Sequence, residues 1–211
     1  MKITVFAVVL AAALCCGIFV CDSSERYKSE SYNWSKEVLD NLGFNQVKDL
    51  EYKFYDIRGS TAPELRKEMN AKGPLDRYGR RGDAFTGWYL SWRWPYDKNG
   101  RPLYNKTRLK KKITVTMPRW SAPADTDPGL LKRWRKFLEN VARHEKNHLD
   151  FFENSYGKIP GAIKTAYRKN PELTEKEANK IAAGIVEKIR MLDRDYDSRT
   201  GHGRTEGISF R

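Results

Sequence analysis

Two long stretches in the second half of the chain carry apolar residues at the spacing of an α-helix. In residues 128–156 apolar side chains recur at intervals of three, four or seven, and Asp127 precedes them as a good N-cap. Residues 174–196 repeat the period and open with the capping-box pattern of Thr174 and Glu177. The sequence therefore predicts two long amphipathic helices.

The first half of the chain instead alternates between apolar and polar residues, which is typical of strands. Residues 50–57, 85–96 and 109–117 show this pattern. The second and third segments flank turn residues at 97–100 and are expected to pair as an antiparallel hairpin. A capping-box pattern opens a short helix in residues 61–73. We therefore predict an α+β fold, in which a small antiparallel sheet packs against the two long helices.

The segments around these elements carry weaker patterns. Residues 22–45 are polar, which predicts a tether with some helix at 35–42. Two glycines and a proline in residues 157–161 are expected to stop the first long helix, and residues 197–211 have no period. Since 211 residues suffice for one ordinary domain, we expect a single domain over residues 46–211.

Residues 1–21 have the pattern of an export signal. Lys2 supplies a positive start, the run from Ile3 to Val20 is almost wholly apolar, and polar residues follow from Asp22. The run is also long enough to span a bilayer if it is retained as an anchor, and Cys21 is a weak candidate for lipid attachment. The sequence thus predicts an exported protein, periplasmic or extracellular, either free or tethered to the membrane by its N-terminus or a lipid.

The composition limits which metal ligands and which charged partners the expected domain can have. All three cysteines lie within the first 21 residues, so the domain has no disulfide and no thiolate metal ligand. The formal net charge of +13 suits contact with an anionic cell-envelope surface. Apart from Lys110–Lys112 and Arg80–Arg81 the basic residues are scattered, which is typical of a solvated surface. No nucleic-acid recognition motif is present, and export argues against specific nucleic-acid binding.

The segment His144-Glu145-Lys146-Asn147-His148 is an HExxH motif inside the first long helix. Residues four apart lie on one helix face, so both imidazoles can bind one ion, here a single Zn²⁺. Glu145 is rotated about 100° from His144 and points beside the metal, where it can act as a general base. The apolar residues on the same side of the helix indicate that the pair faces the interior.

A catalytic zinc site needs a third protein ligand. His202 is the preferred candidate, since it is the only other histidine and has a glycine on each side. Glu175 and Glu177 are rival ligands, although Glu177 is already explained by its capping box. Further candidates are Asp197 as a carboxylate that orients a ligand imidazole, and the tyrosines Tyr196 and Tyr156 as groups that stabilise an oxyanion.

The ordered set YDIRGSTAPELRKEMNAKGP, FTGWYLSWRW, ITVTMPRW, RHEKNH and YDSRTGHG resembles a bacterial family of predicted secreted zinc-dependent proteases, a domain of unknown function with an HExxH motif. The resemblance covers residues 52–207. It implies a zincin-like active-site helix with zinc at His144 and His148, Glu145 beside it, and a metal-binding role for His202.

Two functions are therefore open. The first is an exported zinc metalloendopeptidase, in which Glu145 activates water and a peptide or protein substrate lies along strand 109–117 by strand addition. The second is a non-catalytic, basic module that binds the cell envelope and keeps a structural metal. Exposure of Trp88, Trp92 and Trp94 would favour this second function, whereas their packing in the core would not.

Overall fold

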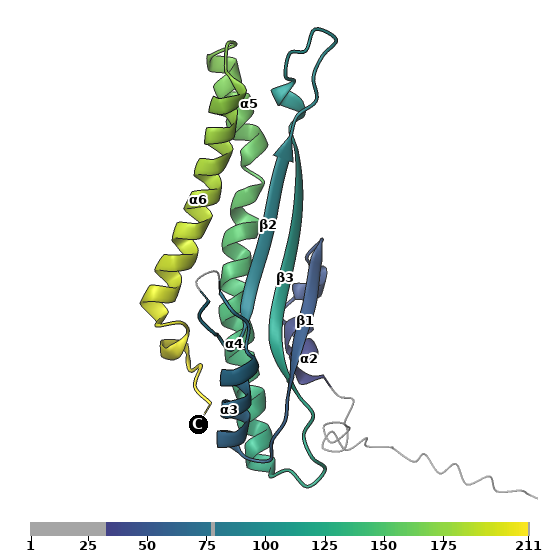
Figure 1. Cartoon of the computed structure of the whole chain (residues 1–211), viewed down its shortest axis with the longest axis vertical. Coiled ribbons are helices and arrows are strands. Elements are labelled where there is room, and N and C mark those ends of the chain that lie inside the picture. Colours follow the sequence, from purple (N-terminus) through teal and green to yellow (C-terminus); the bar gives the residue numbers. More distant parts are fainter. Residues whose placement is uncertain (1–32, 77–78, 211) are drawn as a thin grey trace, which may run out of the picture.

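The computed structural model describes residues 33–76 and 79–210 (Figure 1). The predicted export signal or anchor of residues 1–21, and residues 22–32 of the predicted tether, lie outside the described residues. Among the residues described, no helix is long and apolar enough to cross a membrane.

The sheet has three strands in the order β1-β3-β2, with β1 at Leu50–Ile57, β2 at Phe85–Arg93 and β3 at Arg108–Trp120. β2 and β3 pair antiparallel, which confirms the predicted hairpin. β1 instead pairs parallel to β3, from Leu50 opposite Ile113 to Ile57 opposite Trp120. The prediction of an antiparallel sheet was therefore wrong for one strand, because pairing across a crossover leaves no local trace in the sequence.

The two long helices are confirmed as α4 (Pro128–Tyr156) and α6 (Glu175–Thr200), and both predicted capping boxes are present, at α6 and at α3 (Ala62–Lys72). A further helix, α5 (Ile159–Lys169), occupies the segment expected only to stop α4. Pro160 stands in the first turn of α5, where its missing N–H is not needed. The glycine and proline residues that were expected only to end the first long helix thus also mark the start of α5.

One face of the sheet packs against α4; α6 runs along α4 (Figure 1) and also contacts β2, where Trp92 Nε1 donates a hydrogen bond to Asn179. The main core joins inward residues of the sheet to both α4 and the N-terminal helix α2 (Trp34–Asn41); its fully buried members include Leu39, Phe44, Ile113, Met117, Leu138 and Phe152. Residues 34–44 are thus part of the fold, not of a polar tether, and the domain begins before residue 46.

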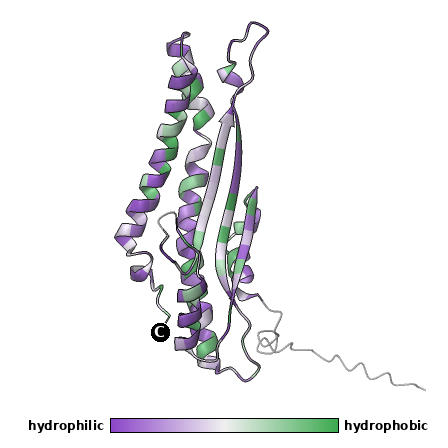
Figure 2. Cartoon of the chain, in the orientation of Figure 1, coloured by the Kyte–Doolittle hydropathy of each residue, from purple (hydrophilic) through white to green (hydrophobic). Residues whose placement is uncertain are grey.

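The tryptophans of β2 and its continuation face the helices. Trp88 stacks on Phe152 of α4, with ring centroids 4.8 Å apart. Trp94 is buried in a second core cluster against Tyr104, and α5 and α6 supply the other members. The tryptophan face is therefore core packing, while the outer faces of the helices and of the β2–β3 hairpin are largely hydrophilic (Figure 2).

Candidate metal centre

α4 places the HExxH residues on the side that faces α6. His144, Glu145 and His148 are all buried, although each carries a polar or charged side chain. Residues one helical turn apart on α6, Asp193 and Asp197, meet them from the opposite helix. The site is thus built mainly from two facing pairs at i and i+4, one of histidines and one of aspartates.

Three ligand-type atoms converge between these helices. The Nε2 atoms of His144 and His148 lie 3.3 Å apart, and Oδ1 of Asp197 lies 3.1 Å from the first and 3.2 Å from the second. No other group of histidine, cysteine or acidic residues gathers in this way in the described part of the chain. Asp197, expected to orient an imidazole from outside, is therefore one of the three converging groups.

The other ring nitrogen of each histidine faces a second carboxylate. His144 Nδ1 lies 2.8 Å from Glu206 Oε2, and His148 Nδ1 lies 3.0 Å from Asp193 Oδ1. Carboxylates placed in this way fix the tautomer of a ligand imidazole and raise its basicity. Burial lowers the pKa of His148, but its contacts with Asp193 and Asp197 outweigh burial and raise that pKa to about 10.

Glu145 is buried beside the cluster, and its Oε2 has no hydrogen-bond partner among the described residues. Its backbone carbonyl accepts a hydrogen bond from Thr86 of β2. Burial raises the pKa of the Glu145 carboxyl group above its usual value. An unpartnered buried carboxylate oxygen costs free energy, so its retention next to the histidines points to use by a ligand or a reaction.

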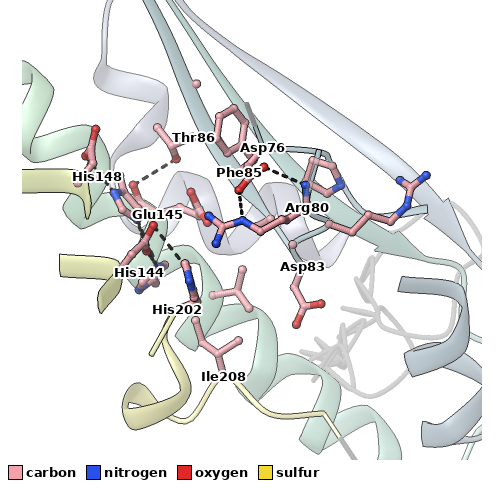
Figure 3. Close-up of a pocket in the computed structure, with 18 of the residues that line it drawn as sticks. Asp76, Arg80, Asp83, Phe85, Thr86, His144, Glu145, His148, His202 and Ile208 are labelled. Atoms are coloured by element: carbon pink, nitrogen blue, oxygen red, sulfur yellow. Dashed lines mark hydrogen bonds and ion pairs between the residues drawn. The ribbon is translucent and has the colours of Figure 1, made fainter. Parts of the chain in front are cut away.

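The cluster opens into a pocket of about 810 Å³, a size typical of small-ligand and peptide subsites. Figure 3 shows His144, Glu145 and His148 on one side of this pocket, facing Thr86 and Phe85 of β2. Arg80 reaches into it from the loop after α3, and Asp76 holds the Nε of Arg80 at 2.8 Å.

The donor set fits a zinc ion. Two imidazole nitrogens and one carboxylate oxygen form a known kind of three-ligand catalytic zinc site. At metal–ligand distances of about 2.0–2.1 Å, tetrahedral geometry would set neighbouring ligand atoms about 3.3–3.4 Å apart. The measured separations of 3.1–3.3 Å are close to this value. The residues present could therefore hold Zn²⁺ with little rearrangement.

Residues 52–203 match a family described as a bacterial protein of unknown function, DUF922. The chain belongs to this family. The match runs from within β1 to just past the end of α6, so it includes the three converging residues, while Glu206 lies beyond it. Searches of curated proteins and of solved structures found no match. The resemblance noted in the sequence is thus confirmed as membership of an uncharacterised bacterial family.

His202, the preferred third ligand on sequence grounds, is not one of the three converging groups. Its Nδ1 lies 3.6 Å from Asp197 Oδ2, and about 63% of its side chain is exposed. It lines the same pocket from the turn after α6, where it adopts a left-handed backbone with φ 56°. The structure therefore places His202 on the exposed side of the pocket, next to Asp197.

The remaining candidates from the sequence are not among the groups that converge with His144 and His148. Tyr196 stacks on the His144 ring, but its hydroxyl donates to Glu206, so it supports that carboxylate. Tyr156 lies against Lys111 at the wall of a different cavity. Glu175 accepts from Tyr96 and Glu177 completes its capping box, both in the first turn of α6, far from Asp193.

Sequence reasoning missed Asp193 and Glu206. The spacing of Asp193 and Asp197, one helical turn apart on the helix after the motif, was a usable signal for a facing pair of carboxylates. Glu206 stands in a short 3₁₀ turn, Arg204–Glu206, and carried no signal, because only the fold of the tail brings it to His144.

Proposed function

We propose that this chain is an exported zinc-dependent peptidase with its metal held by His144, His148 and Asp197. The observation that carries the proposal is the convergence of these three groups beside the buried, unpartnered oxygen of Glu145. Among the residues that the structure describes, three ligand groups converge, and they open to a pocket, which leaves room for water and substrate. Structural zinc sites instead usually close the ion with four protein ligands.

When bound, zinc would polarise a peptide carbonyl and make an attacking water more acidic. Glu145 would accept the proton of that water at Oε2 and return it to the leaving amine, a role for which its raised pKa is suited. His202, on the open side of the pocket, would donate a hydrogen bond to the carbonyl oxygen as negative charge develops there. Glu206 and Asp193 would hold the two imidazoles in position.

The sequence suggested that a substrate peptide would pair with strand 109–117, but the structure favours a different strand. Opposite the start of β2, residues 113–116 of β3 are paired on both sides, so β3 offers no free edge there. β2 is an edge strand of the sheet, and the pocket is lined by residues 83–88 at its start. An extended peptide would therefore add to the free edge of β2, next to Glu145.

The envelope-binding module remains the second proposal. Burial of Trp94, the stacking of Trp88 on Phe152 and the hydrogen bond from Trp92 Nε1 to Asn179 reduce the tryptophan surface on which that hypothesis partly rested, since Trp88 and Trp92 are half-buried. Export itself rests on residues 1–21, so localisation stays a prediction from the sequence. Cell fractionation combined with mass spectrometry of the mature N-terminus would test it.

Metal analysis of the purified protein tests the ligand set. Wild-type protein is expected to hold one zinc, and His144→Ala and Asp197→Ala to lose it. His202→Ala is the matched control, since it removes a histidine from the same pocket without touching a converging atom. Zinc retained in Asp197→Ala and lost in His202→Ala would refute the assignment and restore the ligand favoured by the sequence.

Hydrolysis of a digested-proteome peptide mixture, read by mass spectrometry, tests the activity. Glu145→Gln keeps the shape of the side chain and is expected to bind zinc normally while losing about 10²–10⁴-fold in rate. A zinc-loaded wild-type protein that cleaves no peptide, or a Glu145→Gln variant that cleaves at the wild-type rate, would sink the proposed mechanism.

A further inference from the structure

The positive charge of the chain is concentrated in one hairpin. Residues 84–124 contain nine basic side chains and a single acidic one, Asp97, within a chain whose net charge is +13. The carboxylate of Asp97 is occupied by backbone N–H groups of its own turn, at Asn99 and Arg101. These residues are only nine of the 40 basic residues of the chain, but because a single acidic residue accompanies them, the β2–β3 hairpin and its connecting loop carry much of the net positive charge.

Because side chains alternate along a strand, several of these basic residues lie on the face of the hairpin that points away from the helices. Leu109, Lys111 and Ile113 point toward the helices, so Arg108, Lys110 and Lys112 point away from them, and all three are exposed. On β2 the exposed residues of the same face are Phe85, which lines the pocket at the start of the strand, and Tyr89 and Arg93, which lie opposite the lysines and arginine of β3. We call these five residues, Tyr89, Arg93, Arg108, Lys110 and Lys112, the basic face.

The register brings one pair of like charges together on this face. Arg93 is directly opposite Arg108, Ser91 opposite Lys110 and Tyr89 opposite Lys112. Like charges directly opposite one another in a sheet destabilise it. Only Lys112 has an ion-pair partner within the described residues, Glu51 at 2.9 Å, while Arg93, Arg108 and Lys110 have none there. The fold thus keeps an unfavourable arrangement that an external anion would relieve.

The shape of the basic face indicates an extended partner. β1 pairs with β3 only from Ile113 onward, so the hairpin carrying the basic face projects past β1 (Figure 1). Its three unpaired cations lie on two strands of a sheet rather than around a pocket, and the connecting loop adds the exposed Lys98, Arg101 and Lys106. Tyr89, with about 62% of its surface exposed, adds a side chain suited to a membrane–water interface.

We propose that the basic face docks the domain onto a bilayer of anionic phospholipid. The apolar run of Ile3 to Val20 predicts export or anchoring, and both bring this chain to a membrane. Basic residues near an anionic leaflet are attracted to it, and Tyr89 would sit among the headgroups. This docking is independent of peptidase activity, because the basic face and the metal centre share no residue.

The test is sedimentation of the full chain with vesicles of phosphatidylcholine, with or without phosphatidylglycerol. The triple variant Arg93→Gln, Arg108→Gln, Lys110→Gln removes the unpaired cations, and its fold should hold because a repulsion is removed. The matched control, Lys176→Gln, Lys180→Gln, Lys188→Gln, removes equal charge from exposed positions of α6. All proteins keep Ile3 to Val20, so the measured quantity is the ratio of partitioning between the two vesicle types.

Each basic residue at an anionic surface contributes about fivefold to partitioning. The triple variant is therefore expected to lose about tenfold to 100-fold in the ratio, and the control to stay near wild type. Equal losses in both variants would show an effect of net charge alone and overturn the proposal. A triple variant that lost binding to soluble polyphosphate while keeping the wild-type lipid ratio would equally overturn it, in favour of a polyanion partner.

Discussion

Gly203 links the fold of the tail to the metal centre, and its replacement gives a sharp test of both. It follows α6 in a turn of three left-handed residues and has φ 77°. A Cβ added there would lie 2.2 Å from Cδ1 and 3.0 Å from Cγ1 of Ile208, and 3.3 Å from Nδ1 of His144. Gly203→Ala therefore perturbs the backbone, a neighbouring side chain and a candidate ligand at once.

The expected cost has two separable parts. A left-handed alanine costs about 1–2 kcal/mol relative to glycine. Forcing a methyl group against Ile208 costs about 1–3 kcal/mol, toward the lower end because the end of that side chain can rotate. Gly203→Ala should thus lower the free energy of unfolding by about 2–4 kcal/mol. The contact with His144 should also weaken zinc binding about 10–100-fold, as loss of a supporting contact does.

Urea unfolding and zinc titration measure these effects. Gly184→Ala is the matched control, because a Cβ there meets nothing within 4 Å in the middle of α6, and it should stabilise the protein by up to about 1 kcal/mol. In an Ile208→Ala background the steric part should vanish, leaving the backbone cost of about 1–2 kcal/mol. Wild-type stability of Gly203→Ala, or an unchanged cost in the Ile208→Ala background, would refute the turn geometry.

Three further predictions follow from the same structure. Glu206→Gln and Asp193→Asn should each lower zinc affinity about 10–100-fold by equilibrium titration, while Asp195→Asn, exposed on α6, should leave it unchanged. Zinc at 100 times its dissociation constant should stabilise the fold by about 2.7 kcal/mol, and a chelator should reverse the rise in melting temperature; a metal-insensitive melting curve would contradict the site. Leu39→Ala should cost about 2–5 kcal/mol by urea unfolding and Asn45→Ala almost nothing, since Leu39 is fully buried and Asn45 is exposed.

The elements that could be predicted from the sequence are those whose signal is local. The bounds of β1 and α4 agree with the predicted 50–57 and 128–156, because strand alternation and helix caps depend on neighbouring residues. Helix α5 was not predicted, because a proline such as Pro160 can follow the end of one helix or stand in the first turn of another. The packing of Ile159 and Ile163 against α6, which stabilises α5, cannot be read from the local sequence. The parallel pairing of β1 with β3 is set by contacts across more than fifty residues.

The residues of the candidate site likewise differ in whether a local sequence pattern could predict them. His144 and His148 were predicted because their spacing alone puts both on one face of a helix. The sequence favoured His202 as the third member, whereas Asp197 is the group that converges on the two histidines; which of them does so depends on how α6 is rotated against α4, and no local pattern records that rotation. Histidine was favoured because it is a common zinc ligand. In the structure α6 directs Asp197 toward His144 and His148, and His202 lies on the turn after α6.

The charge balance of the centre explains why metal and fold should be coupled. Three carboxylates, those of Asp193, Asp197 and Glu206, contact two imidazoles, so within these contacts negative charge exceeds what the histidines can neutralise even when both are protonated, and the nearest arginines line the wider pocket. Crowding partly buried carboxylates between two helices is unfavourable without a compensating cation. A divalent ion at His144, His148 and Asp197 would supply that charge where α4 meets α6. A bound ion would therefore strengthen the packing of α4 against α6, and we expect the zinc-loaded fold to lose stability when the ion is removed.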